Sequence, residues 1–459
     1  MRRSSDAVRE QQDVEDWLRA VGGRVYANAE RVPLESVADW SMDPATGAIG
    51  HRTGGFFRIE GLSVYMPGAV VPRWDQPIIN QPEVGILGIL AKEIDGVLHF
   101  LMQAKDEPGN RDGVQLAPTV QATRSNFTRV HQGRPVPYLE YFTDTAPHHV
   151  IADVRQSEHG AWTLRKRNRN MVVQVGDDAE VESRDGFRWM TAGQVHAMLA
   201  VDDVVNMDAR TVLACLPFHR AELAGRLPEV PDDFTAALVR SYTREGVHAT
   251  GDILSWITDL RSETDVRLER TALSGLARWH VGADRITHET GRFFDVVGVK
   301  VEASGREVRG WSQPMIETRR PGLVAFLVTR IDGVLHLLVN LRVEPGLLDV
   351  AELAPTVQCT PGNYDCLPAA ARPVFLDEVL GAPPDRIRAD VMLSDEGGRF
   401  LASMHRHLVV ETDERFDHPG FRWMTLRQFA ELLTHSHYVN VQARSLLACV
   451  NALLLGPVR

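Results

Sequence analysis

A run of closely spaced cations offers the clearest chemistry in this sequence. Residues 165–170 read Arg-Lys-Arg-Asn-Arg-Asn and lead directly into the apolar run Met171–Val175. Alternate side chains of a strand share a face, so Arg165, Arg167 and Arg169 are expected to converge on one side of it. Guanidinium groups bind phosphate oxygens through forked, charged hydrogen bonds, so this spacing predicts a diphosphate site. The alternative is an ordinary solvated charged face.

A loop rich in hydrogen-bond donors precedes this run. Residues 122–131 read Ala-Thr-Arg-Ser-Asn-Phe-Thr-Arg-Val-His, whereas a later, related stretch, residues 359–366, reads Cys-Thr-Pro-Gly-Asn-Tyr-Asp-Cys. The later stretch lacks both arginines and the histidine, so the two stretches diverge where a ligand would bind. The ligand-binding candidates in these loops are Thr123, Arg124, Ser125, Asn126, Phe127 and Asn363.

Several side chains nearby are candidates for proton transfer. Glu140, His131, Lys105, Glu107 and Tyr138 carry carboxylate, imidazole, amine and phenol groups. Such groups exchange protons near neutral pH once burial shifts their pKa values. The sequence does not choose among them.

Two tryptophans lie in matching contexts. Trp74 and Trp311 are each followed two residues later by Gln-Pro. An aromatic side chain in a loop can stack on a pyrimidine base. The alternative is packing inside the core.

The elements that must position these residues occur twice. The segment Leu116–Gln121, Leu-Ala-Pro-Thr-Val-Gln, returns unchanged as Leu353–Gln358, and other segments return at similar spacing. Proline removes a backbone donor, which favours a strand edge or a segment that crosses a cleft. Period-two alternation then places Thr119 with Gln121, and Thr356 with Gln358, as further ligand-binding candidates.

Local patterns give each copy the same order of elements. A helix over residues 8–21 and a shorter one over 32–40 precede short alternating strands, and apolar helices close the copy. Asp95-Gly96 and Asp332-Gly333 each separate two apolar runs and predict tight hairpins. The fold class is therefore α+β, a mixed sheet core flanked by helices in each copy. The expected domains are residues 1–217 and 252–459, joined by a linker over 218–251 with a helix at Asp233–Tyr242.

Composition narrows the class of protein. The chain has 459 residues, 44% hydrophobic and 24% charged, with a formal net charge of −11. This charge argues against a general nucleic-acid binder. The absence of a long apolar run or a signal-peptide pattern predicts no membrane segment and a cytoplasmic location. Four cysteines without a CxxC spacing are expected to be reduced thiols. GxGxxG, P-loop and GxSxG motifs are absent, so redox and ATP chemistry are not expected.

Four segments together resemble one enzyme family. These are the duplicated Leu-Ala-Pro-Thr-Val-Gln, the stretch Val-Gln-Ala-Thr-Arg-Ser-Asn-Phe-Thr-Arg-Val-His, Leu-Arg-Lys-Arg-Asn-Arg-Asn-Met-Val-Val and Val-Asn-Met-Asp-Ala-Arg-Thr-Val-Leu. The chain resembles the NDP-hexose 2,3-dehydratases of deoxysugar biosynthesis. The resemblance implies a tandem pair of Nudix-like modules, a homodimer and a dTDP-4-keto-6-deoxyglucose substrate, in pathways to antibiotics and other actinobacterial products. The glutamate box of hydrolytic Nudix proteins is absent from both halves, so no metal site is expected.

The implied reaction is a lyase reaction that requires no cofactor. The C4 ketone acidifies the hydrogen on C3, and the resulting enolate expels the C2 hydroxyl to give a 3,4-diketo-2,6-dideoxy nucleotide sugar. An NADPH-dependent 3-ketoreductase is expected to consume this product. Glu140 or His131 is the first choice for proton transfer, the arginine run for the phosphates, and Trp74 or Trp311 for thymine.

The first copy is expected to carry the better site, because the second lacks His131 and most of the cationic run. The remaining candidate in the first copy is Lys166. Those in the second copy are Asn363, Arg372, His405, Arg406 and His407. Two alternative functions are a metal-dependent nucleotide-sugar hydrolase and a non-catalytic nucleotide-sugar-binding protein.

Overall fold

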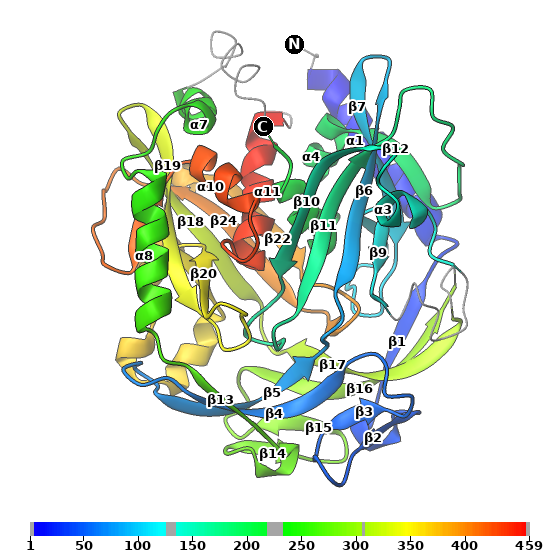
Figure 1. The fold of residues 1–459 in the computed structure, drawn as a ribbon, viewed down its shortest axis with the longest axis vertical. Coiled ribbons are helices and arrows are strands. Elements are labelled where there is room, and N and C mark those ends of the chain that lie inside the picture. Colours follow the sequence, from blue (N-terminus) through cyan, green and yellow to red (C-terminus); the bar gives the residue numbers. More distant parts are fainter. Residues whose placement is uncertain (1–3, 125–134, 218–232, 305–307, 456–459) are drawn as a thin grey trace.

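Two large mixed sheets stand side by side, and two smaller sheets lie beneath them (Figure 1). This computed structural model describes residues 4–124, 135–217, 233–304 and 308–455. Helices flank both large sheets and fill the space between them (Figure 1). The mixed sheets with flanking helices agree with the expected class at this level.

The first large sheet has seven strands in the order β10-β11-β6-β7-β12, with β8 beside β7 and β9 beside β6. Its central strand β6 is buried on both faces, as its nearly continuous apolar sequence requires. The strands are β6 (Gly85–Ile94), β7 (Val97–Lys105), β8 (Gln115–Ala117), β9 (Val120–Ala122), β10 (His149–Ser157), β11 (Arg167–Gln174) and β12 (Phe187–Thr191).

The second large sheet repeats this arrangement in the order β20-β19-β18-β24-β22. Its strands are β18 (Gly322–Ile331), β19 (Val334–Val343), β20 (Ala351–Ala354), β21 (Val357–Cys359), β22 (Ile387–Ser394), β24 (Met404–Glu411) and β25 (Phe421–Met424). Both predicted hairpins are confirmed: Asp95 and Asp332 have φ of 52° and are followed by glycines at φ of 75°. These positive angles match a two-residue turn.

The two smaller sheets exchange strands between the halves. β1, from the first half, pairs with β16 of the second, and β13, from the second half, pairs with β4 of the first. The five-stranded sheet contains β2 (Trp40–Met42), β3 (Ile49–His51), β4 (Arg58–Tyr65), β5 (Arg73–Asn80) and β13 (Arg267–Thr271). The six-stranded sheet contains β1 (Ala27–Val32), β14 (Trp279–Val281), β15 (Arg285–His288), β16 (Phe294–Ala303), β17 (Gly310–Thr318) and β23 (Phe400–Leu401).

Two helices, α5 and α11, lie at the centre and pack against each other. The helices are α1 (Ser4–Gly22), α3 (Glu140–Thr143), α4 (Ala192–Met198), α5 (Met207–Ala214), α7 (Asp233–Thr243), α8 (Thr250–Glu263), α9 (Leu376–Leu380), α10 (Leu426–Leu433) and α11 (Val441–Leu455). The first helix and the linker helix were predicted. The helix expected over residues 32–40 is wrong, because only a 3-10 turn at Leu34–Ser36 forms there and β1 and β2 flank it. No helix in the described ranges is long and apolar enough to cross a membrane.

A reciprocal pair of buried arginines joins the halves at their centre. Arg210 of α5 donates Nε to Ser445 Oγ of α11 at 2.6 Å and also bonds the carbonyl oxygens of Val205 and Ser394. Arg444 of α11 makes the mirrored set, with Nε donating to Thr211 Oγ1 at 2.6 Å and the other nitrogens bonding the carbonyl oxygens of Val439 and Ser157. Each guanidinium therefore satisfies backbone groups of both halves.

Two glycine loops dock reciprocally in the same way. Gly109 donates its N–H to Gly397 O at 2.7 Å, and Gly346 donates to Gly160 O at the same distance. A Cβ atom on Gly109 would lie 1.8 Å from Phe400 O, so only glycine allows this approach. This docking brings the residues around Phe400 of the second half against the first.

A buried carboxyl lies at the same interface and differs between the copies. Glu352 accepts a hydrogen bond from Ser157 Oγ at 2.5 Å, and His437 Nδ1 lies 4.0 Å from its other oxygen. At the mirrored position Gln115 donates to Asp203 Oδ1 at 2.7 Å. Burial raises the pKa of Glu352 to about 7 from an ordinary 4.5. Between these pH values the folded protein keeps this proton and the unfolded chain loses it, so the folded state loses stability as the pH rises.

We expect Glu352→Gln to flatten the pH dependence of stability. A carboxyl with a raised folded-state pKa contributes stability below its unfolded pKa and loses it as pH rises through about 7. Burial lowers the pKa of His437 to about 4, which makes stability rise with pH and so opposes the contribution of Glu352. The pH profile of the wild type alone therefore hides that contribution. From pH 5 to 8 the free energy of unfolding of wild type should fall by about 2–3 kcal/mol relative to Glu352→Gln in urea titrations. Parallel profiles would contradict the shift.

Candidate functional site

A cavity of about 720 Å³ opens between the two halves and is lined by residues of both. The first half supplies β-strand residues, the first turn of α5 and the segment around β2 and β3, and the second half supplies β17 and the residues before β23. The polar lining side chains used below are Lys105, Glu107, Gln121, Glu158, Lys166, Asn168, Asp208, Gln313, Glu396 and Arg399.

A buried arginine from the second half organises the floor of the cavity. Arg399 bonds Glu158 of the first half, and its Nε donates to Glu396 at 2.8 Å and its Nη1 to Gln81 at 3.1 Å. Burial raises the pKa of Glu158, but Arg399 and Lys166 outweigh it, so the pKa lies below its ordinary value. Glu158 is therefore charged, and its charge is balanced from across the interface.

Lys166 and Asn168 reach the cavity from the start of β11. Lys166 Nζ donates to Glu83 O at 2.6 Å, and Asn168 donates to Glu158. Burial lowers the pKa of the Lys166 ammonium to about 8, although the neighbouring Glu158 opposes the shift. A cation of this kind is buried, fixed and close to releasing its proton.

A hydrogen-bonded chain lines a second wall. Lys105 Nζ lies 3.2 Å from Glu107 Oε1, which also accepts from Gln121 Nε2 at 3.1 Å. Asn206 donates to Gln121 Oε1 at 3.2 Å and caps α5 by accepting from Ala209 N at 2.8 Å. The cap therefore fixes the first turn of α5 against this wall.

Asp208, in that first turn, is a buried acid that holds its proton more tightly than usual. Burial raises the pKa of Asp208 well above its ordinary value, and the carboxyls of Glu396, Glu158 and Glu107 raise it further. Burial likewise raises the pKa of Glu396, although Arg399 opposes it. The cavity thus combines a charged carboxylate with a protonated one, the pairing that acid–base catalysis requires.

Aromatic side chains form the outer wall. Trp311 lines the cavity and donates Nε1 to Gln313 Oε1 at 2.8 Å, and Gln313 Nε2 donates to Gly398 O at 2.5 Å. Trp40 and Phe57, which belong to the first half, also line the cavity, and their ring centroids are 4.8 Å apart. This wall offers flat apolar surface beside the polar floor.

Of the residues selected from sequence, Lys105, Gln121, Thr123, Lys166 and Trp311 line the cavity. Glu107, a proton-transfer candidate, also lines it, whereas the structure does not bring the other described candidates into it. Glu140 is exposed on α3, and Tyr138 is buried in the core, where its hydroxyl donates to Glu182 O at 2.6 Å. Arg124 is exposed. His131, Ser125, Asn126 and Phe127 lie outside the described residues.

Two more first-half candidates have structural partners instead. Thr119 Oγ1 bonds Leu101 O and accepts from Leu90 N at 2.8 Å, so it joins the sheet. Trp74 donates to Gln76 Oε1 at 2.9 Å, mirroring Trp311, but does not line this cavity.

The arginine run is split by the pleat of the strand. Lys166 and Asn168 face the cavity, and neither Arg165, Arg167 nor Arg169 lines it. Arg169 pairs with Asp153 at 2.6 Å, and Arg165 is exposed with φ of 51°. The three arginines therefore lie outside this cavity, because the even-numbered positions of the run face inward. Their role in binding a diphosphate stays a prediction.

The second half repeats one wall but not the floor. Gln358 donates to Glu344 at 3.0 Å and accepts from Asn440 at 2.7 Å, like Gln121. Gln442, on the first turn of α11, takes the place of Asp208 and donates to Asp395 at 3.2 Å. The second copy therefore has no carboxyl group at this place.

The other second-half candidates have partners in the fold. His405 lies 2.6 Å from Asp395, Arg406 pairs with Asp390 at 2.6 Å, and Arg372 pairs with Asp377. Thr356 accepts from Leu327 N at 2.9 Å, Asn363 accepts from Phe293 N at 3.1 Å, and burial lowers the pKa of His407 to about 3.

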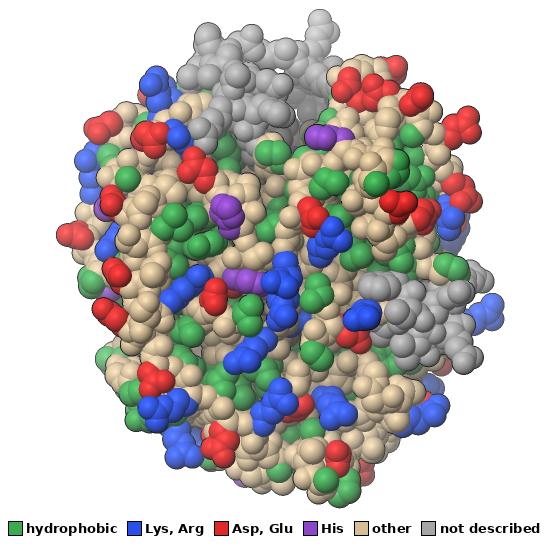
Figure 2. Space-filling model, viewed as in Figure 1, with side chains coloured by type: hydrophobic (Ala, Val, Ile, Leu, Met, Phe, Trp, Pro, Cys, Tyr) green, Lys and Arg blue, Asp and Glu red, His purple; other side chains and the backbone are tan. Residues whose placement is uncertain are grey.

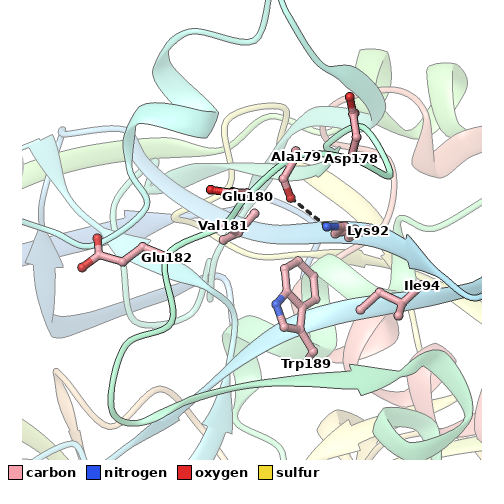
Figure 3. Close-up of a pocket in the computed structure, with 8 residues that line it drawn as sticks. All are labelled: Lys92, Ile94, Asp178, Ala179, Glu180, Val181, Glu182 and Trp189. Carbon is pink, nitrogen blue, oxygen red and sulfur yellow. Dashed lines mark hydrogen bonds between the residues drawn. The ribbon is translucent and has the colours of Figure 1, made fainter.

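A second hollow, of about 600 Å³, lies at the far end of the first large sheet (Figure 3). Asp178, Glu180 and Glu182 line it, and Lys92 Nζ donates to Ala179 O at 2.7 Å. It shares no lining residue with the interface cavity. Its acidic lining disfavours an anionic ligand, so the interface cavity is the better candidate.

Sequence reasoning missed Asp208, Glu158, Glu396 and Arg399. The usable signal was divergence between the copies: Asp208 is matched by Gln442, and Arg399 by Trp162, since Arg399 O and Trp162 O accept from Ile316 N and Ile79 N in the same way. Position in the repeat, rather than a local motif, marks these residues.

Comparison with known proteins identifies the family of this chain. The family model described as NDP-hexose 2,3-dehydratase matches residues 11–216 and 250–450. Three relatives are named dTDP-4-dehydro-6-deoxy-alpha-D-glucopyranose 2,3-dehydratase. The protein from Amycolatopsis orientalis is 48% identical over 97% of this chain and 91% of its own length. That from Saccharopolyspora spinosa is 46% identical over 95% and 90%, and that from Streptomyces violaceoruber 45% over 95% and 96%. The chain belongs to the NDP-hexose 2,3-dehydratase family.

Proposed function

We propose that this chain removes water across C2–C3 of dTDP-4-keto-6-deoxyglucose in the cavity between its halves. The family and the names of three relatives support the reaction. The raised pKa of Asp208 beside the lowered pKa of Glu158 is the observation that supports this place for it. The product is the 3,4-diketo-2,6-dideoxy nucleotide sugar.

The cavity residues divide into three roles. Glu107, held by Lys105, takes the proton from C3, and Asp208 gives its proton to the leaving C2 hydroxyl. The Lys166 ammonium and the Asn168 amide stabilise negative charge that develops at the C4 oxygen, because they are fixed before the reaction begins. At the rim, Arg52 lies beside Asp39 at 2.5 Å and is the exposed cation available to the diphosphate.

We expect Trp311→Ala to raise KM about tenfold while kcat changes little, because base–aromatic stacking contributes about 1–3 kcal/mol to binding. The matched control is Trp74→Ala, which removes the same Trp–Gln hydrogen bond on the face outside this cavity. Initial rates over a range of substrate concentration measure both. A larger rise in KM for Trp74→Ala would move the nucleotide to the other half.

Finer features of the assembly are part of the same proposal. Each half is a Nudix-like module, residues 1–217 and 252–459, with the linker 218–251 between them. The chain acts as a homodimer and passes its unstable diketo product to an NADPH-dependent 3-ketoreductase.

One assay tests the function. The protein is incubated with dTDP-4-keto-6-deoxyglucose, with and without chelator, while a ketoreductase and NADPH trap the product. A 2-deoxy nucleotide sugar, formed equally with chelator, supports the proposal. Free dTMP would favour a nucleotide-sugar hydrolase, and unchanged substrate would favour a binding protein.

A further inference from the structure

Three arginines and a histidine lie together outside the cavity, where β10 and β11 of the first half meet the second half. They are Arg155, Arg165, Arg167 and His437, and we call them the seam cluster. Lys and Arg side chains gather near the middle of this face of the molecule (Figure 2). Arg155 lies opposite Arg169 in the β10–β11 pair. The cluster is therefore next to the cavity but on the other side of β11.

Acidic neighbours do not neutralise the three arginines of the seam cluster, whereas Glu352 Oε1 lies 4.0 Å from His437 Nδ1. Asp153 pairs with Arg169 through both oxygens, at 2.7 and 2.6 Å, and so is already used. Arg155, Arg165 and Arg167 form no ion pair with any acidic side chain that the structure describes, and Arg155 and Arg165 lie near enough to lower the pKa of Arg167, after burial. Unpaired like charges in contact repel, so the group costs folding free energy.

A buried guanidinium nitrogen and a buried imidazole in the seam cluster have no hydrogen-bond partner among the described residues. Arg167 Nε and both ring nitrogens of His437 are buried without a hydrogen-bond partner among the described residues. A buried polar group left unsatisfied costs about 1–3 kcal/mol. The loop that carries His437 is fixed beside Arg155, because Gln156 donates to Leu433 O and His435 O at 3.3 Å. The donors are thus held in place rather than free to turn towards water.

The other copy provides an internal control for the scaffold. Met392 lies opposite Arg406 as Arg155 lies opposite Arg169, and Met404 lies opposite Ser394 as Arg167 lies opposite Ser157. Ala402 and Asp203 share the positive φ of Arg165 and His437, at 48° and 55° against 51° and 66°. The same backbone therefore forms with Met, Met, Ala and Asp, and folding does not require the three arginines and the histidine.

We propose that the seam cluster binds the phosphate groups of a diphosphate at a site separate from the catalytic cavity. A guanidinium group donates two parallel hydrogen bonds to two phosphate oxygens, and the buried imidazole can donate one more to the bound phosphate. Such a ligand bridges β10–β11 and the His437 loop, and so ties the two halves together beside the strand that carries Lys166 and Asn168. The site takes inorganic diphosphate or the diphosphate of a nucleotide.

The test uses inorganic diphosphate, dTDP and orthophosphate in calorimetric titrations of the full chain. The variant Arg155→Met/Arg167→Met copies Met392 and Met404, and Arg406→Met is the control, an arginine at a matched strand position in the other copy. We expect diphosphate binding to weaken at least tenfold in the double variant and to be unchanged in the control. A thermal melt confirms that the double variant folds.

The further arms identify the ligand and separate this site from the substrate site. Wild type should then bind a second equivalent of dTDP. If the double variant loses this second dTDP site together with diphosphate binding, the ligand is a nucleotide. If it loses diphosphate binding but keeps dTDP binding, the ligand is free diphosphate. Turnover and KM of the double variant should match wild type. Equal diphosphate affinity in wild type and double variant would overturn the proposal. A raised KM together with lost binding would also overturn it, since the arginines would then belong to the substrate site.

Discussion

Asp208→Asn should lower kcat about 10³-fold while leaving dTDP binding nearly unchanged, because positioned proton transfer contributes about 10²–10⁴-fold to a rate. Burial raises the pKa of Asp208 well above 3.8, so the acid carries the proton that a leaving hydroxyl needs. Asparagine keeps the shape but has no such proton to give. The measurement is single-turnover formation of the trapped 2-deoxy sugar, with dTDP affinity determined in parallel.

The control for this substitution is Glu352→Gln, which also changes a fully buried carboxyl to an amide but lies outside the cavity. It should keep turnover within about twofold of wild type at pH 7, since a substitution away from the reacting atoms does not alter the chemical step. Turnover of Asp208→Asn within about fivefold of wild type would exclude Asp208 as the donor. Glu396, whose pKa burial also raises, is then the next carboxyl to replace.

Local rules were sufficient for the parts of the fold that local chemistry decides. Asp95-Gly96 and Asp332-Gly333 form the predicted turns because only a few residue pairs accept two positive φ angles. The lead-in over residues 32–40 has helical spacing, but its backbone joins strand β1 and a 3-10 turn instead. There β1 finds its partner in β16, more than half the chain away, so tertiary pairing overrides periodicity.

The site was harder to predict because it is assembled across the halves. The alternation of the run at 165–170 was correctly identified, but sequence gives no sign of which alternate set faces a cavity. The three arginines and Lys166 were selected, whereas the residues of the run that line the cavity are Lys166 and Asn168. Arg399 reaches Glu158 only because the glycine loops dock reciprocally, a contact between residues far apart in the chain.

Strand exchange makes the duplicated chain one folding unit. β1 and β13 each complete a sheet of the other half, and Ala448 and Ala452 of α11 belong to the hydrophobic core of the first half. Neither half can therefore bury its own apolar surface when separated. The catalytic cavity depends on this arrangement, because its floor uses Arg399 and its wall uses Trp311 from the second half.

Arg210→Leu should lower the free energy of unfolding by about 3–5 kcal/mol, the range for breaking a buried charged network. Burial lowers the pKa of Arg210, but the ordinary value is so high that the guanidinium stays charged. Leucine fills much of the volume yet leaves Val205 O, Ser394 O and Ser445 Oγ without their donor. Urea unfolding followed by circular dichroism measures the loss.

Two further variants make this result specific to the interface. Arg169→Leu removes an ion pair that is about 40% exposed on the arginine side, and should cost less than about 1 kcal/mol. Arg444→Leu removes the mirrored network and should cost as much as Arg210→Leu, in a single transition because the halves share strands. If either central variant instead unfolded in two separated steps, the halves would be independent folding units and the arginines would merely join them.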